Sequence, residues 1–110
     1  MATVDIEQLG RAQEDALALT AAAIQIDQAR AEGGSSLTAA LDRNLQLWVG
    51  IKTLMQRPDN PMPQSIRDNL IQLSQFVTQK TFEVSNGVTD EILDSLIAVN
   101  LQISEGLLES

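Results

Sequence analysis

The sequence predicts an all-α protein, specifically an antiparallel bundle of four helices. Apolar residues recur every three to four positions through four segments of helical length, and no segment shows convincing strand-like alternation. Stretches rich in Gly, Pro, Ser and Asn interrupt this pattern at 32–36, 57–63 and 85–89. We therefore expect a single helical domain of residues 1–110 with helices over 4–31, 36–56, 63–84 and 89–108.

Alanine dominates the middle of the first expected helix, residues 4–31, where the chain reads LALTAAAI. Leu9, Leu19 and Ile26 lie within a broad apolar half of this helix. Because alanine side chains are short, we expect a neighbouring element to approach closely here. Gly10 costs about 1 kcal/mol relative to alanine inside a helix, so we expect the first ten residues to fray.

The second expected helix, residues 36–56, has one well-defined apolar stripe. Its members follow a spacing of four, three, four, three and four: Leu37, Leu41, Asn44, Trp48, Ile51 and Met55. Ser36 is the expected N-cap, since its hydroxyl can accept a bond from an amide of the first turn. Pro58 is expected to end the helix, because the residue before a proline is displaced from the α conformation.

The remaining two helices have comparable signals. Pro63 suits the first turn of the helix over 63–84. Its stripe comprises Ile66, Leu70, Leu73, Val77 and Val84, whereas Ile71 and Phe82 lie off it and either widen the buried face or form a second contact. Gly87 is expected to adopt a positive φ. Thr89 is the expected N-cap of the helix over 89–108, whose stripe comprises Ile92, Leu93, Leu96, Val99, Ile103 and Leu107.

Two asparagines, Asn44 and Asn100, fall within apolar stripes on different helices. A buried amide without a partner costs roughly 1–3 kcal/mol, so each is expected to bond to the other asparagine or to a helix backbone. The alternatives are a groove that exposes both amides to a partner, or coincidence. Trp48 is expected to be buried, and the rival interpretation makes it an exposed anchor for a partner.

Composition excludes several function classes. The net charge is −8 and only seven residues are Lys or Arg, so neither nucleic acid nor an anionic membrane is an expected partner. The absence of His, Cys and Tyr removes the usual general base, the thiolate and the commonest metal ligand, so we expect neither an enzyme nor a cofactor. The first ten residues do not resemble a signal peptide, and no apolar run reaches the ~18 residues of a membrane span, which predicts a cytoplasmic protein.

The last quarter of the chain is uniformly acidic. From Glu83 to Ser110 it contains six acidic residues and no Lys or Arg. This segment is either a solvated face that aids solubility or a surface that attracts a basic partner.

Three segments together resemble the FlaF family of bacterial flagellar proteins. They are ALDRNLQLW at 40–48, DNPMPQSIRDNLIQLSQFV at 59–77 and LIAVNLQISEGL at 96–107. The residues that carry the resemblance are Asn44, Trp48, Pro63, Arg67, Leu70, Leu96, Ile97, Asn100, Gly106 and Leu107. The resemblance covers residues 37–107, whereas the expected first helix departs from the family pattern.

The resemblance implies a small cytoplasmic factor for flagellin synthesis or secretion. It implies flagellin as a partner, bound in the manner of a chaperone, and it places the protein beside an FlbT-type regulator. By the same resemblance, residues for partner binding or structure are Asn44, Trp48, Arg67, Asn100, Gly106 and Leu107. The alternative is a self-associating helical adaptor with no flagellar role, and the oligomeric state stays open.

Overall fold

The computed structural model of the chain describes the backbone of residues 6–109 and the side chains of residues 14–107. Its elements are α1 (Ile6–Glu32), α2 (Gly34–Met55), α3 (Gln64–Glu83), the 3-10 turn η1 (Val84–Asn86) and α4 (Asp90–Glu109). No strand occurs within residues 6–109, so the all-α prediction is confirmed. The helix ends lie within about one turn of the predicted ones. The predicted start at residues 4 and 5, and the side chain of Leu9, lie outside the described residues.

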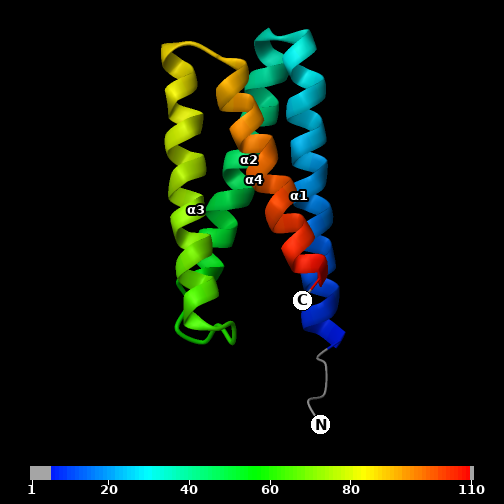
Figure 1. Ribbon diagram of the computed structural model, residues 1–110, viewed down its shortest axis with the longest axis vertical. Helices are drawn as coiled ribbons and strands as arrows, with labels where there is room; N and C mark the ends of the chain where they lie inside the picture. Colours follow the sequence, from blue (N-terminus) through cyan, green and yellow to red (C-terminus); the bar gives the residue numbers. More distant parts are fainter. Residues whose placement is uncertain (1–5, 110) are drawn as a thin grey trace.

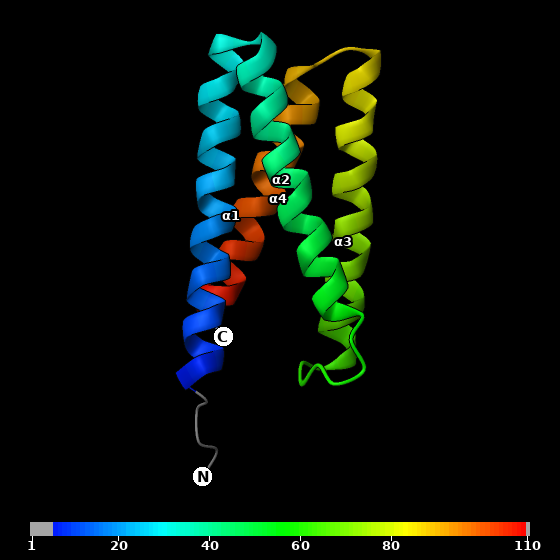
Figure 2. The same ribbon diagram turned by 180° about the vertical axis from the view of Figure 1, so that it is seen from behind.

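The helices alternate in direction along an elongated body of 51 × 22 × 18 Å (Figure 1). α1 and α4 have the most extensive contact of any pair, and α2 packs against both α1 and α3. α4 starts beside α3 and runs diagonally to α1, so α3 and α4 diverge toward the end of the bundle that holds the α2–α3 loop (Figures 1 and 2). The structure is therefore a four-helix bundle in which α3 has few contacts with α4.

The core is aliphatic around a single tryptophan. Its largest fully buried apolar side chains are Trp48, Leu19, Ile26, Leu93, Leu96 and Val77. On α1 the small side chains of Ala16, Ala22, Ala23 and Ala29 are also buried. Short side chains on this face allow α4 to approach α1 closely, as expected from the alanine-rich segment.

The stripe of α3 is less completely buried than its periodicity predicts. Ile66 is exposed at its first turn, where α3 has already separated from α4. Ile71 is half-buried against the core, so it widens the buried face. Phe82 is exposed, so it does not widen the buried face of α3.

The turn between α1 and α2 differs from the prediction. α2 begins at Gly34, so Ser36 lies inside the helix, is exposed, and is not the N-cap. Gly33 and Gly34 have φ values of 67° and 55°, a left-handed conformation that glycine adopts without steric cost. The Gly33 amide donates to the Ala29 carbonyl at 2.8 Å and closes α1, so two glycines reverse the chain without a side-chain cap.

The other predicted turn residues lie close to their expected positions. The Thr89 hydroxyl accepts a bond from the Ile92 amide at 3.2 Å, which confirms this N-cap. Gly87 has the expected positive φ, at 130°. Pro63 precedes the first turn of α3 as its N-cap residue, and its carbonyl accepts bonds from the amides of Ile66 and Arg67.

Candidate functional site

Two asparagines and the tryptophan of the predicted site meet in the interior. α2 supplies Asn44 and Trp48 from successive turns, and α4 supplies Asn100. All three side chains are fully buried. The indole Nε1 of Trp48 donates to Oδ1 of Asn100 at 2.8 Å, and Nδ2 of Asn100 donates to Oδ1 of Asn44 at 2.7 Å. The expected burial of Trp48 and the expected bond between the asparagines are both confirmed.

Asn100 joins three helices through one amide group. Besides its bonds to α2, its Nδ2 donates to the backbone carbonyl of Leu19 in α1 at 3.1 Å. Its carbonyl and both amide protons are therefore used, which satisfies the amide in a site that excludes water. We call Asn44, Trp48, Asn100 and the Leu19 carbonyl the buried amide cluster.

Asn44 is less completely satisfied than Asn100. Its Nδ2 is buried and has no hydrogen-bond partner among the described residues. The assignment of oxygen and nitrogen follows from the cluster, because the reversed amide would place the two Nδ2 donors against each other. The cluster therefore includes one unpaired donor, at a cost of roughly 1–3 kcal/mol.

A second polar contact lies one turn along α4 from the cluster. The Ser104 hydroxyl donates to the Ala16 carbonyl at 2.9 Å, which leaves its oxygen to accept a bond from the Thr20 hydroxyl at 2.8 Å. Ser104 was not predicted from the sequence, because it is a polar member of an otherwise mainly apolar stripe. The signal was present, since Ser104 follows Asn100 by four residues and so lies on the same face.

The chemistry of these groups is neutral. Amides, an indole and hydroxyls donate and accept hydrogen bonds without ionising near neutral pH. Each bond has a fixed partner on another helix, so a shift of α4 along α1 or α2 would break several bonds in the interior. A buried asparagine fixes helix register in this way in coiled coils, at a cost in stability.

Arg67, the next residue of the predicted site, closes the end of α2. Its Nε donates to the Met55 carbonyl at 2.9 Å and its Nη2 to the Arg57 carbonyl at 2.8 Å. A cation is stabilised at a helix C-terminus, where unpaired carbonyls concentrate negative charge. Asn60 binds the same end, since its Nδ2 donates to the Leu54 carbonyl at 2.8 Å.

Gly106 and Leu107, the last two residues of the predicted site, lie near the end of α4. Leu107 is half-buried against the core. Gly106 is exposed, and a Cβ atom added there would have nothing within 4 Å. The fold thus brings together Asn44, Trp48 and Asn100, whereas Arg67 lies at the end of α2 and Gly106 and Leu107 lie near the end of α4.

An ion-pair group that sequence analysis did not identify connects α1 to the start of α4. The Arg30 guanidinium lies 2.8 Å from Asp94, 3.5 Å from Asp90 and 3.2 Å from Asp27. The hydrogen bond to Asp94, together with the charge of the three carboxylates, raises the pKa of Arg30. The spacing of Asp27 and Arg30 on one helix face was visible in the sequence, whereas their partners on α4 required the fold.

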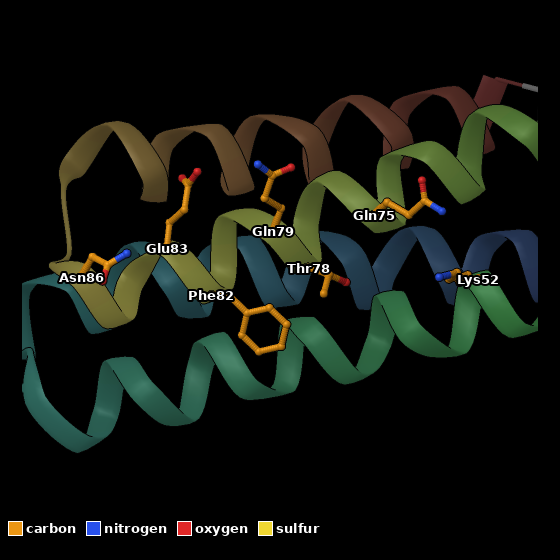
Figure 3. Close-up of a pocket in the computed structure, with 7 residues that line it drawn as sticks. All are labelled: Lys52, Gln75, Thr78, Gln79, Phe82, Glu83 and Asn86. Atoms are coloured by element: carbon orange, nitrogen blue, oxygen red, sulfur yellow. The ribbon is translucent and has the colours of Figure 1, made fainter.

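A hollow of about 520 Å³ lies along α2 and α3 on the surface (Figure 3). Its lining residues are Lys52, Gln75, Thr78, Gln79, Phe82, Glu83 and Asn86. The Phe82 ring extends from α3 toward α2, and the Gln79 and Glu83 side chains extend from the other side of α3 in this view (Figure 3). In the described part of the chain, no group of three or more His, Cys, Asp or Glu side chains is placed to hold a metal ion. No described helix is both long and apolar enough to cross a membrane.

Comparison with known proteins gives one family. A family model described as flagellar protein FlaF matches residues 4–107, so it includes the segment of α1 that departs from the expected pattern. No curated protein matches the chain, and no solved structure matches it.

Proposed function

The chain belongs to the FlaF family of flagellar proteins, and we propose that it supports flagellin synthesis or secretion by binding flagellin as a chaperone-like helical bundle. The family match over residues 4–107 is the observation that carries this proposal. The proposed place of action is the cytoplasm, where flagellin is made, and the proposed role is binding rather than catalysis.

The exposed apolar side chains of the helices, rather than the buried polar residues, support a binding role. The conspicuous asparagines and tryptophan bond to one another in the interior, so they are not available to a partner. Several large apolar side chains remain exposed on the helices instead. A small bundle can hold an amphipathic helix of another protein against such side chains, which is a common mode of peptide recognition.

Binding of purified flagellin to this protein, measured by titration calorimetry, tests the proposal. We expect a complex that forms with full-length flagellin and is lost when the terminal helical segments of flagellin are removed. Binding that is absent at tens of micromolar would refute the chaperone-like role. The same titration with an FlbT-type regulator in place of flagellin would then show whether the regulator is the partner.

The competing function is a self-associating adaptor. Exposed apolar side chains are also expected of such a protein, and sedimentation distinguishes the two. A stable dimer or larger assembly without flagellin affinity would favour the adaptor. The net charge of −8 opposes self-association, because it makes two copies repel each other.

A further inference from the structure

Three large apolar side chains lie exposed along the junction of α1 and α4. Leu17 and Ile24 of α1 are 68% and 50% exposed, and Leu101 of α4 is 41% exposed. We call these three residues the α1–α4 patch. The helices that carry them lie side by side in both views of the molecule (Figures 1 and 2).

The two leucines and the isoleucine share one side of the junction. Leu17 and Ile24 are seven residues apart, so they lie on the same face of α1, on either side of Thr20. Thr20 contacts Ser104 of α4. Leu17 and Ile24 therefore lie about one turn before and one turn after the point at which Thr20 meets α4.

Leu101 lies on the matching face of α4. It follows Asp94 by seven residues, and Asp94 bonds to Arg30 of α1. The antiparallel pairing of Thr20 with Ser104 and of Arg30 with Asp94 places Leu101 opposite about position 23, close to the height of Ile24. The patch thus spans the junction, and the seven-residue separation on α1 extends it about 10 Å along the bundle.

The border of the patch is acidic. Asp27 and Asp94 are exposed beside it, and so is Glu105. Arg30 is the only Lys or Arg among the described side chains of α1 and α4, and it is shared among the three carboxylates of Asp27, Asp90 and Asp94. One guanidinium against three carboxylates leaves this border with a net negative charge.

We propose that the α1–α4 patch binds an amphipathic helix of a partner protein whose apolar stripe is bordered by Lys or Arg. Leu17, Ile24 and Leu101 supply apolar contact on both sides of the junction, and Asp27, Asp94 and Glu105 attract the basic border. A second copy of this chain fits poorly, because its own acidic border would face this one. The other large exposed apolar side chains lie on other elements, namely α2, α3 and the α3–α4 connection: Val49, Ile66, Phe82 and Val88.

This inference deepens the proposed function and rests on it only for the name of the partner.

The direct probe is a fluorescently labelled synthetic helix of 18 residues, with leucines along one stripe and lysines on both borders. A second peptide replaces every lysine by glutamate. Fluorescence anisotropy measures the Kd of each peptide for the full chain.

A matched pair of triple variants locates the contact. One carries Leu17→Gln, Ile24→Gln and Leu101→Gln. The control carries Phe82→Gln, Val49→Gln and Ile66→Gln, at positions that are 65%, 51% and 44% exposed and so lose similar apolar surface. Circular dichroism confirms that both variants keep the wild-type helix content.

We expect the lysine peptide to bind wild type and the control alike, to lose at least about tenfold in affinity for the patch variant, and to bind less well as salt rises. The glutamate peptide should bind much more weakly than the lysine peptide. No binding of the lysine peptide, equal effects of the two variants, or equal affinity for the two peptides would each overturn the inference. So would a wild-type dimer that the patch variant abolishes.

Flagellin, titrated against the same three proteins, separates the two proposals. If flagellin binds wild type and both variants equally, the patch is not the site that binds flagellin and the proposed function stands. If the lysine peptide behaves as expected but flagellin does not bind wild type, the patch stands and the flagellin proposal fails. Loss of flagellin binding in the patch variant alone supports both.

Discussion

Replacing Asn100 by leucine is expected to destabilise the protein more than replacing Asn44, although both side chains are fully buried. Asn100→Leu leaves the Trp48 indole N–H and the Asn44 Oδ1 without partners. At roughly 1–3 kcal/mol for each newly unpaired buried group, the free energy of unfolding falls by about 2–6 kcal/mol. Asn44→Leu strands one amide proton of Asn100 but also removes the Asn44 Nδ2 that already lacks a partner among the described residues. These effects oppose each other, so the expected loss is only about 0–2 kcal/mol.

The double variant distinguishes this reasoning from simple loss of two contacts. With both asparagines replaced, only the Trp48 N–H remains newly unpaired, at roughly 1–3 kcal/mol. Adding Asn44→Leu to Asn100→Leu should therefore restore stability. Leucine has as many side-chain heavy atoms as asparagine but a larger volume, so overpacking should subtract part of that gain.

Urea unfolding, followed by far-ultraviolet circular dichroism, measures all three variants against wild type. Asn69→Leu is the control, because Asn69 is exposed on α3 and should change stability little. A double variant less stable than Asn100→Leu, or equal losses for the two single variants, would refute the bond assignments within the buried amide cluster. Contacting residues couple in such a cycle, whereas independent ones add.

Three further predictions follow from the helix ends, the glycines and the tryptophan. Thr89→Ala should lower the free energy of unfolding in urea by about 0.5–2 kcal/mol, because it removes an N-cap. Ser36→Ala, inside α2, should lower it by under about 0.5 kcal/mol. A loss for Ser36→Ala as large as that for Thr89→Ala would contradict the position of Ser36 inside the helix. Gly106→Ala should raise stability by up to about 1 kcal/mol, because alanine favours a helix and its Cβ would meet nothing within 4 Å. Gly33→Ala should lower stability by about 1–2 kcal/mol through strain at positive φ. Thermal unfolding should show these opposite signs. The fluorescence of Trp48 should be quenched only weakly by acrylamide in the folded protein and strongly in urea; strong quenching of the folded protein would contradict its burial.

Periodicity predicted the faces of the helices but few of the contacts between them. The spacing around Asn44 and Asn100 placed both amides inside, and a buried amide requires a partner, so their bond could be predicted. That Trp48 donates to Asn100 could not be predicted in the same way. It depends on how far α4 is displaced along α2, and no pattern within a single helix contains that distance.

Departures from the prediction have local causes. Ser36 follows the pattern of an N-cap, yet Gly33 and Gly34 reverse the chain first, because left-handed backbone needs fewer residues than a side-chain cap. Phe82 is large and apolar but exposed, whereas Ile71, which is also off the main stripe, packs against the core. A position off the stripe therefore does not decide burial. The group around Arg30 joins residues that lie 64 positions apart, so only the folded chain brings them together.

The pairing of α1 with α4 also determines the order in which the fold can be completed. Bonds such as that from Asn100 to the Leu19 carbonyl close loops of about 80 residues, and such contacts form late because the chain must first give up the freedom of everything between them. During synthesis, at about 5–20 residues per second, α1 emerges several seconds before its partner helix. Throughout that interval Leu19 and Ile26 have no α4 to cover them, and a nascent chain that stops before Asn100 leaves the Trp48 indole without its acceptor. The interior can therefore close only once α4 has been translated, since α4 supplies the partners of both α1 and α2.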